Sequence, residues 1–536
     1  MNNPLLSIEH LSVTFNHQQT VVDDISFEIF PGETFALVGE SGSGKSMTAL
    51  SVLRLLPNNA QLNATAIHLQ GDNLLARSER ELCKIRGRRI GLVFQDPMSS
   101  LNPVMTIAEQ IVEVLDIHFD FPAEKNQQRV LELLQQVELP EPQRRMAEYP
   151  HQLSGGQRQR VMIAIALAGE PELLIADEPT TSLDVTIQAQ ILQLLKNIQQ
   201  QTNMALWLIS HDLALVSNIA DRIAVMQHGK LVESGCNPGL FEHPQHAYTQ
   251  QLLAALPRLE SCNNRPAQER QPLLSVTDFK VYYPIRKGIF KRIVDYVKAV
   301  DGVSFNLQQG KTLALVGESG CGKTTLGKGL LNLIAGSSGS VLLDGLALHE
   351  LSGDALRQQR AAMQIVFQDP FSSMNPRMLV GDIIAEGLHA LHPEIKALDR
   401  QQRVQHLLTA VGLPKEAINR YPHEFSGGQR QRICIARALA VEPKLIVCDE
   451  PTSALDVSVQ AQIIQLLKQI QQETGVSYLF ITHDFGVVAE LADDVAVMYK
   501  GKIVEVGHVT QVLNHPVHAY TQKLLGAVPK LGGITP

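Results

Sequence analysis

Two glycine-rich segments have the spacing of a phosphate-binding loop. GESGSGKS occupies residues 39–46 and GESGCGKT occupies residues 317–324. Glycines at this spacing let the backbone curl so that its N–H groups point inward at phosphate oxygens. Lys45 and Lys323 would open a helix and reach the outer phosphates, and the hydroxyl residue after each lysine would be offered to Mg²⁺. A structural glycine turn could explain either segment alone, but it explains two matching segments poorly.

Two acidic pairs could supply a metal ligand and a general base. Asp177–Glu178 and Asp449–Glu450 each end an apolar run and are followed by proline. A carboxylate at the end of a strand beside a phosphate loop can hold Mg²⁺ directly or through water. Because adjacent side chains diverge, the second acid is free to polarise an attacking water. Such a pair often only caps a helix, but this context favours catalysis.

Two histidines and two glutamines recur beside the same apolar runs. His211 and His483 each close a run in the pattern [ST]-H-D, and Gln95 and Gln368 follow another run in VFQDP. A histidine at that edge could sense the γ-phosphate, and a neutral amide could contact Mg²⁺ or the attacking water. A lone histidine is more often structural and a lone glutamine an exposed turn residue. Recurrence at matched positions favours the functional interpretation.

A second glycine-rich helix start, SGGQ, occupies residues 154–157 and 426–429. It offers backbone donors and the positive end of a helix dipole to an anion. Because a domain with one nucleotide should not need two phosphate-binding helix ends, we expect each SGGQ to serve the nucleotide bound by the other copy. The alternative is a serine N-cap with glycines that allow close packing.

All of these segments occur twice, in the same order. SGGQ begins at Ser154 and again at Ser426, and HPxHAYT begins at His243 and again at His515, in each case 272 residues later. Conserved order at a near-constant offset indicates two copies of one domain rather than a short-period solenoid.

Within each copy, short apolar runs alternate with longer helical patterns. Residues 34–39, 172–177 and 205–210 are Val-, Ile- and Leu-rich runs of the kind found in buried strands. The alternation predicts an α/β fold with a largely parallel sheet. Residues 96–164 and 369–436 are helix-rich and predict an inserted helical subdomain in each copy.

Composition narrows the class of protein. The 536 residues include 46 Lys and Arg against 54 Asp and Glu, for a net charge of −8, which argues against a nucleic-acid binder.

The six cysteines form no CxxC pair, which suggests a reducing compartment without a zinc ribbon. Cys321 lies inside the second phosphate loop, where the helix start could favour a thiolate, although the simpler interpretation is a small residue that fits. We expect no signal peptide, and no apolar run reaches about 18 residues.

Two segments depart from the repeat. Residues 261–272 are polar and contain proline, which predicts a linker between the copies. Residues 284–296, PIRKGIFKRIVDY, are an insertion near the start of the second copy. Its basic side chains could touch phosphate or lipid head groups, but a solvated basic loop explains them equally well.

In this order, the motifs resemble the nucleotide-binding domains of ATP-binding cassette (ABC) proteins. The resemblance implies an α/β fold class with two P-loop NTPase domains in tandem, each a RecA-like α/β core with an inserted helical subdomain. The expected boundaries are residues 1–260 for the first domain, 261–272 for the linker and 273–536 for the second domain. It also implies that the domains pair head to tail, with two ATP molecules and Mg²⁺ at sites formed within one chain.

The resemblance also assigns residues to two sites. The first site would combine Phe15, Gly39, Ser41, Gly42, Gly44, Lys45, Ser46, Gln95, Asp177, Glu178 and His211 with Ser426, Gly427, Gly428 and Gln429. The second would combine Tyr283, Gly317, Ser319, Gly320, Gly322, Lys323, Thr324, Gln368, Asp449, Glu450 and His483 with Ser154, Gly155, Gly156 and Gln157. The catalytic residues would be Glu178, His211, Glu450 and His483. The Mg²⁺ ligands would be Ser46, Gln95, Asp177, Thr324, Gln368 and Asp449. Phe15 and Tyr283 match the aromatic that stacks on adenine, and residues 182–184 and 454–456 match the loop that couples the two sites.

The subfamily can be narrowed by three longer motifs. VFQDPxSSLNP, YPHxLSGGQRQR and HPxHAYT are similar to motifs in the ATPases of bacterial dipeptide, oligopeptide, nickel and glutathione importers, and the tandem resembles the fused ATPases of Yej-type oligopeptide and glutathione importers. The implied function is ATP hydrolysis that energises peptide uptake through two integral-membrane permeases, with an extracytoplasmic solute-binding protein as an indirect partner. The implied location is peripheral, on the cytoplasmic face of the bacterial inner membrane. Glutathione and nickel are the alternative cargoes.

Three other functions are less consistent with the sequence. A tandem ABC protein acting on ribosomes or DNA typically has a long charged linker or basic extensions, and this chain has a short linker and an acidic balance. A regulatory clamp that binds ATP without hydrolysis would not need both glutamates and both histidines. An exporter is disfavoured by the HPxHAYT tail. Some importer relatives carry a cysteine cluster after this tail, but here the region holds only Cys262, so we expect no iron–sulfur centre.

Overall fold

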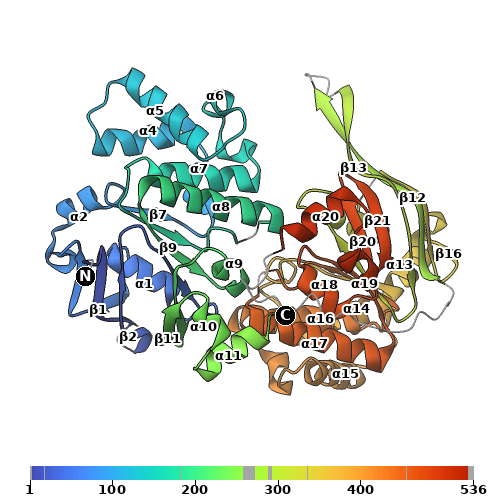
Figure 1. Cartoon of the computed structure of the whole chain (residues 1–536). Helices are drawn as coiled ribbons and strands as arrows, with labels where there is room; N and C mark the ends of the chain where they lie inside the picture. The colour runs from blue at the N-terminus through green and yellow to red at the C-terminus, as the bar shows by residue number, and fades with distance from the viewer. Residues whose placement is uncertain are drawn as a thin grey trace. The chain divides into compact units, whose positions relative to one another are not determined.

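The computed structural model describes residues 3–16, 18–181, 183–256, 272–287, 292–334, 336–453 and 455–528. The chain divides into two compact units, Met1–Ala255 and Leu256–Val528. Of the predicted linker, residues 261–271 lie outside the described residues. Figure 1 labels the helices and strands of both units.

The first unit contains a six-stranded sheet that carries the sites. Its order is β11 (Lys230–Cys236), β10 (Arg222–Gln227), β3 (Thr34–Val38), β9 (Ala205–Ser210), β8 (Leu173–Asp177) and β7 (Ile90–Val93). All neighbours are parallel except β10 and β11. The residues of β3 and β9 are buried along their whole length, as expected for strands covered on both faces. This confirms the predicted α/β class.

A second, antiparallel sheet completes the strands of the first unit. It runs β2 (Gln19–Ile29), β1 (Leu6–Phe15), β5 (Ala66–Leu69) and β6 (Asp72–Asn73), and β4 (Ala60–Asn63) also pairs with β1. Between the two sheets, Trp207 and Phe35 are almost fully buried. The Phe27 ring stacks on Phe35 with centroids 5.0 Å apart and meets Trp207 edge-on at 5.3 Å, so aromatic packing joins the sheets.

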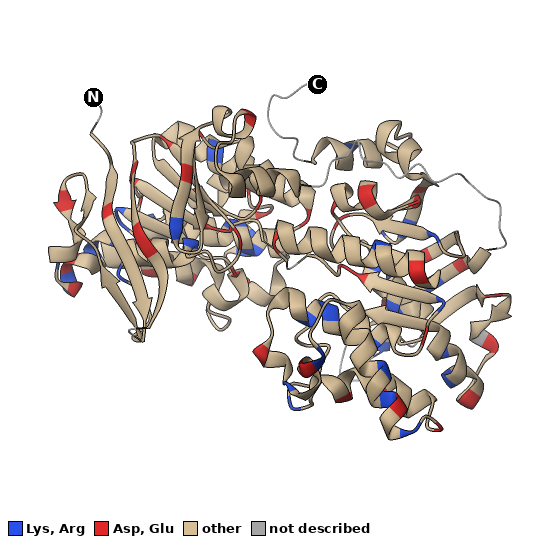
Figure 2. Ribbon diagram, turned by 90° about the horizontal axis from the view of Figure 1, so that it is seen from below, with Lys and Arg blue, Asp and Glu red and all other residues tan. Residues whose placement is uncertain are grey.

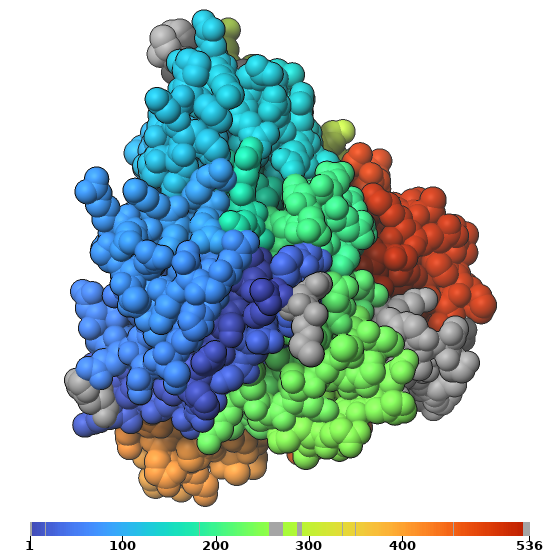
Figure 3. Space-filling view, turned by 60° about the vertical axis from the view of Figure 1, so that its left-hand side comes forward, coloured from blue at the N-terminus to red at the C-terminus, as the bar shows by residue number. Residues whose placement is uncertain are grey.

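Helices of the first unit fall into two groups. One group packs around the sheet: α1 (Lys45–Val52), α2 (Glu79–Ile85), α8 (Val185–Thr202), α9 (Leu213–Ser217), α10 (Gly239–Glu242) and α11 (Ala247–Ala254). The other is the predicted helical subdomain: α3 (Pro97–Ser100), α4 (Ile107–His118), α5 (Ala123–Gln136), α6 (Pro142–Arg145) and α7 (Gly155–Leu167). In Figure 1, α4, α5 and α6 lie together at one end of the unit, and Figure 3 shows the same segment in cyan.

The second unit repeats this plan. Its main sheet runs β17 (Met363–Val366), β18 (Leu445–Asp449), β19 (Ser477–Ile481), β14 (Thr312–Val316), β20 (Asp494–Tyr499) and β21 (Lys502–His508). Its antiparallel sheet runs β13 (Arg292–Gln308), β12 (Pro272–Lys287), β15 (Ser337–Leu343) and β16 (Leu346–Ala347). The helices are α12 (Lys323–Leu330), α13 (Gly353–Ala362), α14 (Val380–Leu391), α15 (Ala397–Ala410), α16 (Gly427–Leu439), α17 (Val457–Thr474), α18 (Phe485–Leu491), α19 (Val509–Asn514) and α20 (Ala519–Gly526).

The insertion in the second copy forms strands rather than a loop. Residues 284–287 and 292–296 continue β12 and β13, which pair with each other as far as Lys287 and Arg292, and residues 288–291 lie outside the described residues. Figure 1 shows this hairpin running well beyond β16. Ile293, Val294 and Tyr296 are exposed there. Alternation of β-branched and aromatic residues explains the strand conformation.

Figure 2 shows acidic and basic residues interspersed along the helices and strands of both units. Within the residues that the structure describes, no helix is long and apolar enough to cross a membrane.

Candidate functional site

The first glycine-rich segment forms a curled loop between β3 and α1. Gly42 and Gly44 have φ angles of 77° and 105°, a left-handed conformation that favours glycine. Gly44 is the residue that precedes α1. The Lys45 side chain is only 4% exposed, and its Nζ donates to the carbonyl oxygens of Gly39 and Glu40, each at 2.7 Å. The ammonium group therefore lies within the loop, as a phosphate-binding lysine requires.

The second glycine-rich segment repeats this geometry. Gly320 and Gly322 have φ angles of 78° and 110°. Lys323 Nζ donates to the carbonyl oxygens of Gly317 at 2.7 Å and Glu318 at 3.0 Å. The matching contacts show that the loop conformation is determined by the motif rather than by one local environment.

A hydroxyl from each loop contacts the first acid of the predicted pair. Ser46 Oγ donates to Asp177 Oδ1 at 3.0 Å, and Thr324 Oγ1 donates to Asp449 Oδ1 at 2.9 Å. Both aspartates end a strand that lies near the phosphate loop, β8 or β18. Burial raises the pKa of both carboxyl groups, and the hydroxyl hydrogen bond only partly offsets this effect.

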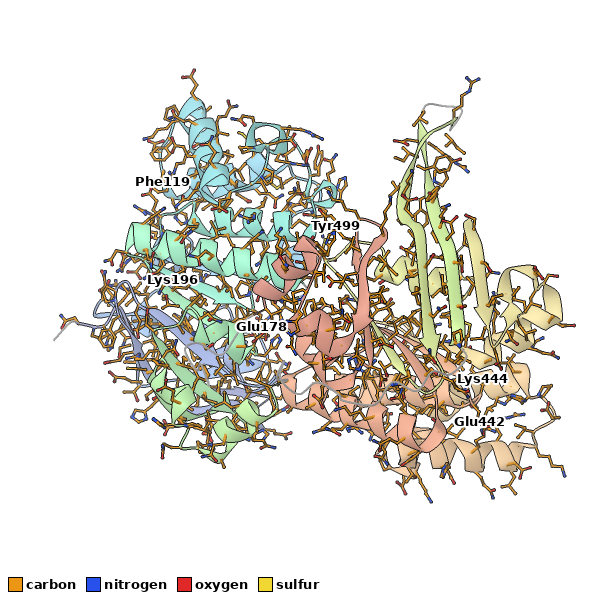
Figure 4. The ribbon with its side chains drawn as sticks, turned by 45° about the vertical axis from the view of Figure 1, so that its right-hand side comes forward. Phe119, Glu178, Lys196, Glu442, Lys444 and Tyr499 are labelled. Atoms are coloured by element: carbon orange, nitrogen blue, oxygen red, sulfur yellow. The ribbon has the colours of Figure 1, made fainter. Side chains whose placement is uncertain are left out.

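The second acid of the first copy lies at the centre of a polar cluster. Glu178 directly follows β8 and is labelled in Figure 4. Its Oε2 accepts hydrogen bonds from Gln95 Nε2 at 2.7 Å and from Thr181 Oγ1 at 2.9 Å. Its Oε1 lies 3.1 Å from His211 Nδ1. The structure therefore brings together three residues predicted from distant parts of the sequence.

The same cluster in the second copy differs in one contact. Glu450 Oε2 accepts from Gln368 Nε2 at 2.9 Å, and its Oε1 lies 3.4 Å from His483 Nδ1. Where the first copy has a threonine, Ser453 donates its hydroxyl to the backbone carbonyl of Glu450 at 3.1 Å instead of to the carboxylate. The contact of Thr181 was not predicted, because nothing in its motif distinguishes a carboxylate partner from a turn residue.

The Glu–His pairs hold the glutamates in the ionised form. Burial by itself would raise the pKa of Glu178, but the hydrogen bond and charge of His211 outweigh it and lower this pKa to about 2. Burial would lower the pKa of His211, and the Glu178 carboxylate more than compensates and raises it. The pKa of Glu450 is lowered and that of His483 raised for the same reasons. A general base must be deprotonated near neutral pH, and both glutamates satisfy this condition.

The SGGQ segments begin helices with a reciprocal cap. Ser154 Oγ accepts from the Gln157 backbone N–H at 3.4 Å, and Gln157 Oε1 accepts from the Ser154 N–H at 3.0 Å. Ser426 and Gln429 make the same two bonds at the start of α16, at 3.0 and 3.4 Å. The structural alternative to phosphate binding, an N-capping serine, is therefore present. This cap leaves the start of α7 accessible to an anion, because Gly155 is exposed.

The glycines of SGGQ have different surroundings. A Cβ atom at Gly156 would lie 2.8 Å from Cγ2 of Ile187 on α8, whereas one at Gly155 would lie 3.5 Å from Cδ2 of Leu183. Gly156 thus allows α7 to pack closely against α8, whereas an alanine at position 155 would fit without a clash. Leu183 belongs to the predicted coupling loop, of which residue 182, like residue 454 in the other copy, lies outside the described residues.

The two predicted adenine-stacking aromatics lie in related places on the antiparallel sheets. Phe15 ends β1, pairs with Gln19 and Ala60, and packs partly buried against the core. Tyr283 lies on β12 opposite Val297 and is 40% exposed. Their stacking on adenine stays a prediction.

The structure favours the simpler interpretation of Cys321, a small residue that fits, over a thiolate. Its side chain is 7% exposed, and burial raises the pKa of the thiol despite the nearby Lys323. Ser43 occupies the equivalent place in the first loop and is also buried, at 5% exposure. Cys321 is a small side chain that fills the inside of the loop.

Comparison with known proteins identifies the family. A family model described as "ABC transporter" matches residues 22–181 and 300–453. A second model, described as "Oligopeptide/dipeptide transporter, C-terminal region", matches residues 232–280 and 504–535. The first model matches once in each copy and the second model matches after each of these segments, which confirms the tandem arrangement of two ABC cassettes.

Three relatives match over nearly the full length. The chain is 50% identical to "Peptidoglycan transport ATP-binding protein YejF" of Agrobacterium fabrum, covering 98% of this chain and 96% of the relative. It is 50% identical to "Uncharacterized ABC transporter ATP-binding protein YejF" of Escherichia coli, covering 98% and 99%. It is 44% identical to "Glutathione import ATP-binding protein GsiA" of Pectobacterium atrosepticum, covering 98% and 89%. The chain therefore belongs to the ABC transporter family, as the tandem ATP-binding, ATP-hydrolysing protein of an importer of the oligopeptide/dipeptide type.

Proposed function

We propose that the chain binds two ATP molecules and that each is enclosed by the phosphate loop of one copy and the SGGQ helix start of the other. The observation that carries the proposal is the duplicated loop geometry, in which a buried lysine lies among the loop carbonyls. Each copy has one such loop and one exposed SGGQ helix start. If the copies pair head to tail, each nucleotide contacts two helix starts: the one after the phosphate loop of one copy and the one at SGGQ of the other copy.

The Ser46–Asp177 and Thr324–Asp449 pairs fit Mg²⁺. This cation is usually held by one or two carboxylates together with substrate phosphates and water. The described residues contain no group of three or more His, Cys, Asp or Glu that could hold a metal alone, so this donor set suits a cation that arrives with ATP. When bound, Mg²⁺ would neutralise phosphate charge. Gln95 and Gln368 would complete its surroundings on the predicted assignment.

Glu178 and Glu450 act in the proposal as general bases. Each glutamate is held ionised by its histidine and is oriented by a glutamine amide. The carboxylate would accept a proton from the attacking water, and the histidine would stabilise the position of the carboxylate and contact the γ-phosphate. Because Gln95 and Gln368 follow the last strand before each helical subdomain, their contact with the glutamate links that subdomain to the reaction.

The proposed cargo is peptide, carried through two permeases on the cytoplasmic face of a bacterial inner membrane. The support is the twofold match to the C-terminal region of oligopeptide/dipeptide transporters and the relative named for peptidoglycan transport. An extracytoplasmic solute-binding protein would select the solute. Glutathione is the second candidate, because a relative 44% identical is named for glutathione import.

The test is uptake of labelled oligopeptides by cells that carry the wild-type chain or the Glu178→Gln/Glu450→Gln double variant. We expect uptake only with the wild type, and we expect the purified variant to retain ATP with hydrolysis sharply reduced, since the amide cannot accept the proton. Normal steady-state hydrolysis by the double variant would refute the role of the glutamates. Equal uptake in both strains, with an active wild-type ATPase, would exclude peptide cargo, and glutathione and nickel would then be assayed.

A further inference from the structure

A tyrosine from the C-terminal part of each copy reaches the phosphate loop of the same copy. Tyr248, on α11, accepts a hydrogen bond through Oη from the backbone N–H of Glu40 at 3.3 Å. Tyr520, on α20, accepts one from the backbone N–H of Glu318 at 3.0 Å. Both tyrosines come from the repeated HAYT segment and are buried, with 5% and 8% exposure. The contact spans more than 200 residues of sequence in each copy.

The residue that the tyrosine contacts also holds the loop lysine. Glu40 offers its N–H to Tyr248 and its carbonyl oxygen to Lys45 Nζ, the latter at 2.7 Å. In the second copy, Glu318 does the same with Tyr520 and Lys323. Because the peptide groups on either side of this residue are each fixed by one partner, the tyrosine restricts where the lysine ammonium can lie.

The tyrosine in the first copy is itself held in place. Glu233 on β11 accepts the backbone N–H groups of Gln245 and His246 at 2.7 and 3.1 Å, and His246 Nδ1 accepts the Tyr248 N–H at 3.2 Å. These bonds anchor the start of α11 to the sheet. The hydroxyl is thus presented to the loop from a fixed helix.

The second copy has the same support. Glu505 on β21 accepts the N–H groups of Val517 and His518 at 2.8 and 3.1 Å, and His518 Nδ1 accepts the Tyr520 N–H at 3.1 Å. The Tyr520 ring also packs on Tyr499, labelled in Figure 4, with centroids 4.1 Å apart. Two copies whose sequences have diverged elsewhere retain every bond of this arrangement.

We propose that Tyr248 and Tyr520 are positioning residues for ATP binding: each fixes its phosphate loop, and with it the loop lysine, from the C-terminal helix. The proposal rests on the proposed assignment of the loops as ATP sites. It gives the C-terminal region a direct role at the nucleotide, because displacement of α11 or α20 would withdraw the hydroxyl from the loop.

The experiment compares the full-length chain with the Tyr248→Phe/Tyr520→Phe double variant, which removes only the two hydroxyl groups. A neutral hydrogen bond that is lost from a ground-state site weakens binding by about three- to tenfold. We therefore expect the KM for ATP to rise about three- to tenfold with little change in kcat. Tyr499→Phe, which removes a hydroxyl from the neighbouring ring, is the matched control and should keep the wild-type KM.

A second readout separates positioning from a general structural effect. Binding of fluorescent trinitrophenyl analogues of ATP and AMP is measured for each variant, because only the former carries the outer phosphates that the lysine would reach. We expect weaker binding of the ATP analogue and unchanged binding of the AMP analogue. An unchanged KM, or an equal loss for both analogues, would overturn the proposal. A wild-type chain without ATP binding would instead refute the proposed function, which keeps the two failures distinguishable.

Discussion

Adding a methyl group to each glycine of the first SGGQ separates close packing from phosphate binding. In Gly156→Ala the new Cβ would lie 2.8 Å from Ile187 Cγ2, well inside ordinary contact, whereas in Gly155→Ala it would lie 3.5 Å from Leu183 Cδ2. Both changes gain similar helix propensity, up to about 1 kcal/mol. Overpacking in a core typically costs about 1–3 kcal/mol, and this cost falls on Gly156→Ala alone.

We therefore expect the free energy of unfolding of the two variants to differ by about 1–3 kcal/mol, with Gly155→Ala the more stable. At about 2–4 °C per kcal/mol for a domain of this size, the melting temperatures should differ by roughly 2–12 °C. Differential scanning calorimetry of the two full-length variants measures this difference, on the unfolding transition that the substitution shifts. Equal melting temperatures would refute the packing argument.

Gly155→Ala should lose ATPase activity although it keeps its stability. Gly155 is exposed at the start of α7, so a methyl group there meets no crowded neighbour but would obstruct a phosphate that approaches the helix end. We expect a stable protein whose steady-state ATPase rate is reduced about tenfold to a hundredfold, as for a small displacement of reacting groups. Wild-type activity in this variant would show that no phosphate approaches α7, and the head-to-tail assignment would fail.

Three further predictions follow from single contacts. Ser46→Ala removes the hydroxyl that contacts Asp177, so the Mg²⁺ concentration for half-maximal ATPase activity should rise several-fold. Chelation of Mg²⁺ with EDTA should abolish the activity of the wild type. An unchanged Mg²⁺ requirement in Ser46→Ala would contradict the metal assignment. Burial alone would raise the pKa of Glu233, but hydrogen bonds to the carboxylate outweigh burial and hold the pKa below its usual value. The contribution of Glu233 to stability is therefore present above pH 4.5 and is lost as the pH falls below that value. Glu233→Gln should lower the melting temperature more at pH 7 than at pH 4, and an equal effect at both pH values would refute this. Mild alkylation followed by mass spectrometry should modify exposed Cys83 and leave buried Cys321 intact, whereas rapid modification of Cys321 would show that the loop opens.

The sequence predicts local features of this protein well because they depend on short-range rules. The phosphate loops, the α/β alternation and the helical subdomains follow from glycine spacing, buried apolar runs and helix patterns. Closeness of Glu178 and His211 also follows, since both come directly after parallel strands and therefore lie at one edge of the sheet. Their roles in catalysis stay predictions.

Contacts between distant segments were not predictable in the same way. Tyr248 looks like a core aromatic in its helix, and only the packing of α11 against the sheet brings its hydroxyl to Glu40. Thr181 contacts Glu178 because of a local turn that the motif does not reveal. The insertion in the second copy contains glycine and basic residues, and a solvated loop was one of its two interpretations, but it extends β12 and β13. The tyrosine contact and the extended hairpin depend on tertiary neighbours, whereas the Thr181 contact depends on a turn conformation that the motif does not specify.

The near-identity of the two central strands has a consequence for folding. β3 has the sequence TFALV and β14 has TLALV, and each occupies an interior position in its own sheet. Either strand could therefore form the backbone hydrogen bonds of the other sheet, although Leu313 in the place of Phe35 would lose the ring contact with Phe27. Exchange of homologous elements is a characteristic misfolding route of repeated domains, and synthesis from the N-terminus opposes it because the first domain folds before the second is complete. We therefore expect the order of translation to protect this chain against strand exchange, and we expect this protection to be lost when the whole chain refolds from denaturant.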